Sequence, residues 1–316
     1  MIHSTRIKAI DNSPIKDGAD DKRTIPPGLF KPHTTTLISG KTGSGKSTAL
    51  IRMLKAYCDA GVFQKLILIS PTASYDVKYK MLPLTDVHEE YSDDLLDEIM
   101  EEQKADMEEY KQNEEDIKLY TKYMSGKRLS NKELLRLYTM LNPMTDELVK
   151  PVQTFDKLPY TAVVLDDLGG TPAFRNGNNF LNSIVCKSRH YLTNFYVCVQ
   201  HPYQCPRALR SQCSHVMLFA TKDKKLLEEL AKENCSHLAP DQFVQMFQHA
   251  TADPHSFMLC DFKTNEVRKN FDEVLKFSEN KSVPMTNGKE RQGQQTQEQK
   301  QKQKQHTNSG QNPHQY

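Results

Sequence analysis

A phosphate-binding loop constrains this chain more than any other feature of its sequence. Residues 39–48 read SGKTGSGKST, which contains the pattern GxxxxGK[ST], and they follow the β-like stretch 34–38. Glycines at this spacing let consecutive backbone N–H groups turn inward around a phosphate, and the following helix adds the positive end of its dipole. The run therefore predicts a strand–loop–helix unit that binds a nucleoside triphosphate.

The same pattern assigns roles to individual side chains. We expect Lys46 to reach the β- and γ-phosphates and Ser47 to ligate Mg²⁺. The predicted nucleotide-binding set is Gly40, Lys41, Thr42, Gly43, Ser44, Gly45, Lys46, Ser47 and Thr48.

Apolar runs of strand length alternate with helical patterns along most of the chain. We expect a helix over about 46–60, stopped by Gly61, and another over 180–191. Continuously apolar strands separated by helices indicate an α/β fold with a mainly parallel sheet flanked by helices. The expected strands are 34–38, 65–70, 160–165, 195–199, 216–219 and 257–260.

A helical insertion interrupts this alternation at about 85–150. One apolar stripe is Leu95, Leu96, Ile99 and Met100, and a second is Leu129, Leu134, Leu135, Leu137 and Tyr138. Gly126 separates the two stripes, which predicts a helical hairpin. Its acidic run, 89–116, is either a solvated helix face or a docking surface for a basic partner.

Charge and composition divide the 316-residue chain further. Residues 81–160 carry 10 Lys and Arg against 19 Asp and Glu, a balance of −9, whereas the remainder carries 32 against 21, a balance of +11. A basic body fits a protein that neutralises phosphate backbones, although many proteins without nucleic acid share it. We expect a flexible arm over 1–24, one folded domain over 25–278 and a disordered Gln/Lys-rich tail over 279–316.

The chain shows no signal for secretion or for membrane insertion. Its N-terminus lacks an apolar h-region, and its longest apolar runs fall far short of a transmembrane segment. The seven cysteines are odd in number and lie mostly in apolar segments, which fits reduced thiols in a cytosol-like compartment. A zinc site among Cys198, His201, Cys205, Cys213 and His215 lacks the usual ligand spacing, so core packing is favoured.

Two further strands end in side chains that suit phosphoryl transfer. The strand 160–165 delivers Asp166 and Asp167, and the strand 195–199 delivers Gln200. Parallel strands place their carboxyl ends at one edge of a sheet, where the phosphate loop also lies. We expect Asp166 to support the metal, Asp167 to hold the attacking water and Gln200 to touch the γ-phosphate or its water, a capping role for Gln200 being the alternative.

Arginines flank the strand that ends in Gln200. Arg189 precedes this strand, whereas Arg207 and Arg210 follow it. Each is a candidate for a finger that stabilises charge on the transferred phosphoryl group, and each is also a candidate for a surface or DNA contact.

The ordered set GKTGSGKST, LILISPT, VVLDDLGG, KSRHYLTNFYVCVQHPYQCPRALRSQCSHVMLF and SFMLCDFKT resembles the genome-packaging ATPases of poxvirus-like large DNA viruses, virophages and Polinton-type elements. These belong to the FtsK/HerA superfamily of ring-forming DNA pumps. The resemblance covers roughly residues 30–265, apart from most of the insertion. It implies a P-loop NTPase fold of the RecA-like (ASCE) type.

The resemblance also implies an activity. It gives ATP and Mg²⁺ as cofactors, Lys46, Asp167, Gln200 and Arg189 as catalytic residues, and Ser47 and Asp166 as Mg²⁺ ligands. Many superfamily members carry Glu where Asp167 stands, so the reach of this base is one methylene shorter here. It further implies a homo-oligomeric ring that moves double-stranded DNA without regard to sequence, docks at capsid or portal vertex proteins, and works in the host-cell cytoplasm or a viral factory, with virion association left open.

Two alternatives remain at the level of sequence. A P-loop kinase of a small metabolite shares the loop and the sheet but needs an Arg-rich lid, whereas this insertion is acidic. A non-motor nucleotide-binding factor for virion assembly is the other, and the two acids and the glutamine argue against it. A GTP switch is disfavoured because Asn131-Lys132-Glu133-Leu134 and Thr221-Lys222-Asp223-Lys224 both lack the final Asp of the guanine motif.

Overall fold

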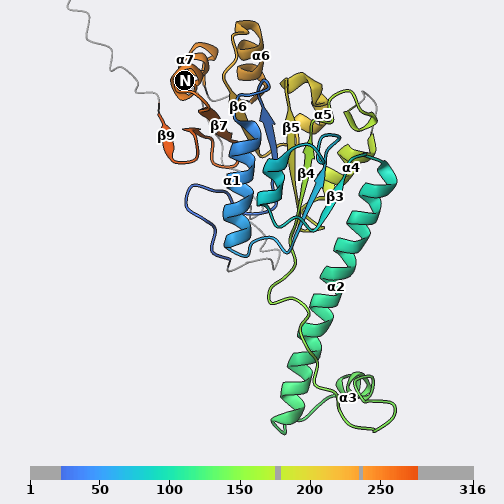
Figure 1. Cartoon of the computed structure of the whole chain (residues 1–316). Coiled ribbons are helices and arrows are strands. Elements are labelled where there is room, and N and C mark those ends of the chain that lie inside the picture. Colours follow the sequence, from blue (N-terminus) through green and yellow to red (C-terminus); the bar gives the residue numbers. More distant parts are fainter. Residues whose placement is uncertain (1–22, 175–178, 235–237, 277–316) are drawn as a thin grey trace, which may run out of the picture. The chain divides into compact units, whose positions relative to one another are not determined.

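The computed structural model describes residues 23–174, 179–234 and 238–276, which Figure 1 shows coloured along the sequence. Within them, nine strands form one sheet in the order β3-β2-β4-β5-β1-β6-β7-β8-β9. The strands are β1 (Thr35–Ser39), β2 (Lys65–Ile69), β3 (Asp86–His88), β4 (Thr161–Asp166), β5 (Thr193–Val199), β6 (His215–Phe219), β7 (Phe257–Asp261), β8 (Glu266–Lys269) and β9 (Glu273–Leu275).

The sheet is parallel from β3 to β6, which confirms the predicted α/β class. β7, β8 and β9 then add an antiparallel extension on the far side of β6. All six predicted strands are present within two residues of their expected bounds. β3, β8 and β9 escaped prediction because they are short and rich in charged residues, with no apolar run.

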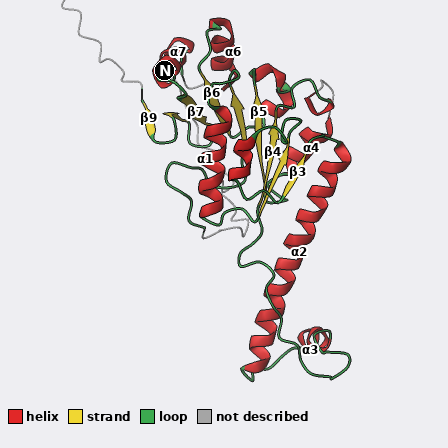
Figure 2. Ribbon diagram, viewed as in Figure 1, coloured by secondary structure: helices red, strands yellow, loops and turns green. Residues whose placement is uncertain are grey.

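Helices cover both faces of the sheet (Figure 2). They are α1 (Lys46–Asp59), α2 (Asp93–Met124), α3 (Asn131–Tyr138), α4 (Asn179–Lys187), α5 (Arg207–Arg210), α6 (Lys224–Asn234) and α7 (Pro240–Ala250), with short 3₁₀ turns η1 (Val77–Met81), η2 (Pro172–Phe174) and η3 (Pro202–Gln204). Helix α4 ends four residues before its predicted limit, because the chain turns at Lys187–Tyr191 and reaches a positive φ of 50° at Leu192.

The core lies on the two faces of the sheet. On one face, Leu50, Leu54 and Tyr57 of α1 pack over Ile38 and Val164. On the other face, helices α2, α4, α6 and α7 pack over alternate strand residues such as Leu37 and Val163. The period-two alternation of buried side chains along each strand therefore feeds two separate apolar layers.

Helix α2 begins against the body and then leaves it (Figure 1). Ser92 caps its N-terminus, and Leu96, Ile99 and Met100 enter the core. Gln103 is buried and donates to the carbonyl of Pro159 at 2.9 Å. Helix α3 follows after Gly126, so the predicted helical hairpin is confirmed.

The second predicted stripe of the hairpin does not form a buried face. Of its helical residues, Leu137 is buried, whereas Leu134 is 40 % exposed and Leu135 and Tyr138 are each 69 % exposed. Among the described helices and strands, α3 makes its main contact with α2, and an eight-residue helix presents only one narrow side to it.

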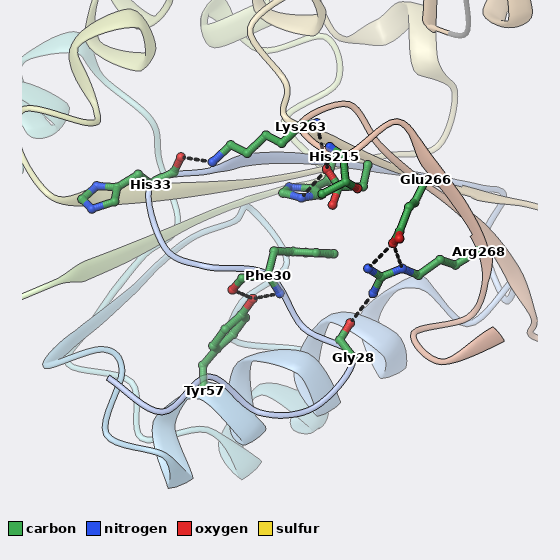
Figure 3. A network of polar contacts seen from close by, with 10 residues as sticks. Gly28, Phe30, His33, Tyr57, His215, Lys263, Glu266 and Arg268 are labelled. Atoms are coloured by element: carbon green, nitrogen blue, oxygen red, sulfur yellow. Dashed lines mark hydrogen bonds and ion pairs between the residues drawn. The ribbon is translucent and has the colours of Figure 1, made fainter. Parts of the chain in front are cut away.

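The amino edge of the sheet is closed by a polar network between β6, β7 and the segment before β1 (Figure 3). His215 is fully buried, stacks on Phe30 with ring centroids 3.6 Å apart, and lies 3.4 Å from Asp261. Asp261 also accepts hydrogen bonds from the backbone N–H groups of Lys263 and Thr264. The Lys263 ammonium donates to the carbonyl of His33 at 3.0 Å.

Several expectations about the chain's limits fall partly outside the described residues. The arm over 1–24 and the tail over 279–316 stay predictions, because residues 1–22 and 277–316 are not described. Arg23 is buried and donates to the carbonyl of Val62 at 2.8 Å. In the described ranges, no helix combines the length and apolarity needed to cross a bilayer.

Candidate active site

The carboxyl ends of three adjacent strands meet at the phosphate loop. The order β4-β5-β1 places β5 between the strand that carries Asp166 and the strand that leads into the loop. Asp166 pairs with Cys198, and the Gly40 N–H donates to the Val199 carbonyl at 3.2 Å. The sheet therefore brings the loop, the two acids and Gln200 to one edge, as the sequence predicted.

The loop is tightly built. Gly45 adopts a positive φ of 104° as it leads into α1, and a Cβ on Gly40 would lie 2.7 Å from Ser44 Oγ and 2.6 Å from Phe219 Cβ. The Lys46 ammonium donates to the carbonyl of Gly40 at 2.6 Å and to that of Lys41 at 3.3 Å. Backbone N–H groups and a lysine thus converge at the N-terminus of α1, the arrangement that suits phosphate.

Asp167 and Gln200 are in direct contact. The Gln200 side-chain amide donates to Asp167 Oδ1 at 3.2 Å. Asp167 has a φ of 55°, so its side chain leaves the line of β4. Gln204 in turn accepts hydrogen bonds from the backbone N–H groups of Gln200 and His201, at 2.9 and 3.0 Å. These hydrogen bonds hold the backbone of Gln200 in place at the end of β5.

Asp166 lies behind this pair and is 9 % exposed. The Tyr79 hydroxyl, from η1, donates to Asp166 Oδ2 at 2.7 Å. Burial raises the pKa of the Asp166 carboxyl, the hydrogen bond from Tyr79 opposes this shift, and the charge of Asp167 adds to it. A cation beside Asp166 would offset the cost of keeping it ionised. Cys198, beneath it, has a pKa raised well above the ordinary value by burial.

A cleft of about 940 Å³ extends from the loop along α1. Its lining includes the two acids, Gln200 and residues 253–256 of the turn before β7. It is also lined by Pro26, Pro27, Leu29, Arg52, Asn270 and Phe271. A volume of this size accommodates a nucleotide together with its phosphates.

Three residues near the loop had no sequence signal for a role here: His255 and Asp76, which line the cleft, and Tyr79, which contacts Asp166. His255 has a φ of 63°, its Nδ1 lies 3.3 Å from the Ser44 carbonyl, and its Cβ would be 3.1 Å from a Cβ on Gly45. Tyr79 and Asp76 come from the crossover between β2 and β3. Only the folded sheet brings such segments to the loop, so no motif could have found them.

The arginine candidates separate in the structure. Arg210 donates to the Cys205 carbonyl at 2.7 Å, pairs with Glu233 at 3.0 Å and stacks over Tyr203, so its guanidinium is engaged in packing its own subunit. Arg207 is exposed on α5. Arg189 precedes β5, at the opposite edge of the sheet from Gln200. Seven strand residues separate the two, roughly 20 Å at the usual rise per residue. The structure therefore does not bring Arg189 to the loop of its own chain.

Most of the described cysteines are buried. Cys198, Cys205, Cys213 and Cys260 are buried, Cys58 is partly buried and Cys186 is exposed, while Cys235 lies outside the described residues. Among the described residues, no group of three or more His, Cys, Asp or Glu side chains is placed to hold a metal ion.

No protein-family model matches the chain, and neither does any curated protein. Among solved structures, the chain is similar to the genome-packaging NTPase B204 from Sulfolobus turreted icosahedral virus 2 in complex with AMP. The two are 13 % identical with a TM-score of 0.47, and the match covers 78 % of this chain and 98 % of that one.

Two further structures are similar over a smaller share of their own length. The monomeric pCW3 conjugation coupling protein TcpA is 14 % identical, with a TM-score of 0.36 and coverage of 72 % of this chain and 57 % of that one. The cytoplasmic domain of the Thermomonospora curvata type VII secretion ATPase EccC is 16 % identical, with a TM-score of 0.38 and coverage of 73 % and 24 %. The chain itself is a mixed α/β protein whose phosphate loop lies at the carboxyl edge of a mainly parallel sheet.

Proposed function

We propose that this protein is an ATP-driven motor that moves double-stranded DNA into a preformed capsid, as a genome-packaging ATPase of the FtsK/HerA type. One observation carries the proposal. Three adjacent strands bring a phosphate loop, a pair of acids and a glutamine to one edge, and the glutamine is hydrogen-bonded to the outer acid. A site with acids and an amide beside the loop suits hydrolysis, because positioned groups of this kind orient water.

The residues fit ATP and Mg²⁺. The loop N–H groups, the N-terminus of α1 and Lys46 would hold the phosphates, and Ser47 and Asp166 would hold the metal. Asp166 suits a metal ligand because it is buried and its pKa is raised, so that a neighbouring cation stabilises its ionised form. When bound, ATP would supply the phosphoanhydride and Mg²⁺ a charge that neutralises it.

Asp167 and Gln200 would act on water. Asp167 Oδ1 accepts a hydrogen bond from Gln200, which leaves the other carboxylate oxygen to accept a hydrogen bond from the attacking water. Gln200 stands between Asp167 and the loop, so it is placed to respond to the terminal phosphate and to shift Asp167. This role for Gln200 would link the state of the nucleotide to the turn at His201–Gln204.

A ring would complete the site. Arg189 lies at the amino edge of its own sheet, so a finger role requires a neighbouring subunit whose amino edge faces this cleft. The positive balance outside residues 81–160 suits contacts with DNA phosphates, and such contacts are indifferent to base sequence. We place the protein in the host-cell cytoplasm or a viral factory, in contact with capsid or portal vertex proteins.

ATP turnover with and without double-stranded DNA tests this function. We expect DNA to raise turnover by the wild type, and we expect Lys46→Ala to lower turnover about 10³-fold because a main source of charge stabilisation is lost. Lys55→Ala, on the same helix but outside the cleft, is the matched control and retains turnover. If DNA leaves ATP turnover unchanged and the protein phosphorylates a small metabolite, the motor function is wrong and the kinase alternative is favoured.

A mixing experiment tests the finger. Arg189→Ala and Asp167→Ala subunits are each expected to be inactive alone. In a mixed ring, some interfaces pair an intact Asp167 with an intact Arg189, so activity returns. If the mixed subunits assemble into rings but stay inactive, Arg189 does not act in a neighbour's active site.

A further inference from the structure

The insertion consists of two parts of opposite character. Its first part, residues 86–109, carries twelve Asp and Glu against one Lys, a balance of −11, and we call it the acidic stem. Its second part, residues 110–153, carries six acidic against eight basic residues, a balance of +2, and we call it the distal hairpin. The acidity predicted for the whole insertion is therefore confined to the part nearest the body.

The distal hairpin is ordered by polar contacts. Ser130 and Glu133 form a capping box at the start of α3, and Lys122 pairs with Glu133 at 2.6 Å. The hydrogen bond from Lys122 lowers the pKa of Glu133 to about 2. Arg136 pairs with Asp116 at 2.6 Å and donates to the Gln112 carbonyl. These contacts hold α3 against the end of α2 without a large apolar core.

Many apolar side chains of the distal hairpin are exposed instead. Fourteen large hydrophobic side chains are exposed among the described residues, and eight of them lie in the distal hairpin. They are Tyr123, Met124, Leu134, Leu135, Tyr138, Met144, Val149 and Val152. Leu134, Leu135 and Tyr138 share one side of α3 by their helical spacing. A concentration of this kind on one limb marks a protein-binding surface.

A second exposed group lies on the body. Tyr75, Val77, Met81 and Val87 are 50–83 % exposed and belong to η1, its flanks and β3, and we call them the edge patch. β3 is the last strand on its side of the sheet. The acidic stem starts on this strand, and Glu89 contacts Ser74. The edge patch is therefore an apolar surface bordered by negative charge.

The distal hairpin and the edge patch are complementary in charge and apolar character, but the hairpin of one chain cannot reach the edge patch of the same chain. The distal hairpin offers apolar side chains with the exposed cations Lys127, Arg128 and Lys132, whereas the edge patch offers apolar side chains beside the acidic stem. About 25 Å of helix separates Met107, which packs on the body, from Met124. The distal hairpin would have to break α2 to reach the edge patch of its own chain.

We propose that the distal hairpin of one copy docks on the edge patch and acidic stem of a second copy. The contact is head-to-tail, because the two surfaces differ, and contacts of this type close into rings or continue as filaments. The inference deepens the ring proposed above and rests on it only in expecting that copies assemble. The cleft residues Asp76 and Lys78 adjoin Val77, so the docked hairpin would lie beside the neighbour's nucleotide site.

Sedimentation velocity of the full chain tests the docking with two variants. Leu135→Asp/Tyr138→Asp disables the distal hairpin, and Met81→Asp/Val87→Asp disables the edge patch. We expect the wild type to form assemblies larger than dimers and each variant alone to be monomeric. An equimolar mixture should give heterodimers and nothing larger, because one intact hairpin meets one intact edge patch. Val274→Asp, an exposed valine outside both surfaces, is the matched control and assembles as the wild type does.

The possible results separate the alternatives. A monomeric wild type, or a distal-hairpin variant that still assembles, overturns the proposal. An edge-patch variant that still self-associates shows hairpin pairing with hairpin, which also overturns it. Nucleotide binding, measured with a fluorescent ATP analogue in every variant, shows that the variants are folded. If the wild type binds the ATP analogue but does not assemble, the docking is wrong and the proposed ATPase stands. If the wild type assembles as expected but does not bind the analogue, the proposed ATPase is wrong and the docking stands.

A third variant tests the charge component alone. Lys127→Glu/Arg128→Glu/Lys132→Glu changes no apolar side chain and places like charges opposite the acidic stem. We expect self-association about 10-fold weaker than that of the wild type at low salt, with the difference shrinking at high salt. An unchanged affinity at low salt contradicts the assigned partner surface.

Discussion

The two edges of the sheet differ in character: the amino edge is a buried polar network, and the carboxyl edge borders an open cleft. At the amino edge, His215, Asp261 and Phe30 are buried against one another, and backbone N–H groups and carbonyls complete the network. At the carboxyl edge, the Lys46 ammonium donates to carbonyls of its own loop, and Asp167 and Gln200 contact each other in the wall of an open cleft. The difference teaches that changes at the first edge should alter stability, whereas changes at the second should alter chemistry.

The largest expected effect is on stability, at the amino edge. His215→Ala leaves the buried Asp261 without its neighbouring imidazole and opens a cavity beside Phe30, which should lower the free energy of unfolding by about 3 kcal/mol. His249→Ala is the matched control, because His249 is exposed and lies 3.5 Å from Glu273. Chemical denaturation measures both. If both variants lose the same free energy of unfolding, the buried pair at the amino edge is no more important for stability than the exposed pair.

The next effect is on turnover, at the carboxyl edge. Asp167→Asn keeps the hydrogen bond to Gln200 within reach but removes the group that accepts a proton, so ATP turnover should fall about 10²-fold. Denaturation midpoints and nucleotide affinity should stay close to those of the wild type. Asp156→Asn, at an exposed position outside the cleft, is the control. A large loss of stability in Asp167→Asn would mean that this edge is also structural.

Tyr79 offers a smaller test of the same edge. Tyr79→Phe removes the hydroxyl that donates to Asp166 and keeps the ring that packs beside α1. Because such a supporting group orients a metal ligand, we expect the Mg²⁺ concentration for half-maximal ATP turnover to rise about 10-fold. Tyr57→Phe is the control, since the Tyr57 hydroxyl hydrogen-bonds to the backbone of Phe30 rather than to an acid of the site. If the Mg²⁺ concentration for half-maximal turnover is unchanged, Tyr79 has no role in positioning a metal ligand.

The smallest effect concerns pH. Burial lowers the pKa of His215, and the nearby cations Lys263 and Arg268 lower it further, against the opposing charge of Asp261. Below about pH 6.5 the unfolded chain therefore takes up a proton that the folded chain resists. The free energy of unfolding should fall as the pH drops from 6.5 towards 5, by at most about 1.4 kcal/mol per pH unit. His215→Ala should flatten this slope, and a slope that persists in the variant would assign it to another group.

The carboxyl edge was predictable because its residues follow strands. The loop, Asp166, Asp167 and Gln200 each end an apolar run, and a parallel sheet sends such ends to one place. Asp76, His255 and Phe271 reach the cleft from a crossover, a turn and an antiparallel extension, whose positions depend on packing rather than on local pattern. The amino edge had no motif at all, since a lone buried histidine resembles any other core residue.

The insertion shows a related limit. Its helices were predictable from periodicity and from Gly126, but periodicity does not say whether the stripe of Leu134, Leu135 and Tyr138 is buried or exposed. Burial of an apolar stripe depends on a partner surface, and in the described part of the chain these three side chains are exposed.

In the proposed function, the carboxyl edge couples ATP hydrolysis to movement along double-stranded DNA. Displacement of a third strand from a triplex on linear double-stranded DNA tests this claim directly, because the third strand is released only when a motor passes. We predict release by the wild type with ATP, no release with a non-hydrolysable analogue, and no release by Asp167→Asn. ATP hydrolysis by the wild type without release of the third strand would show that the protein is not a motor on double-stranded DNA.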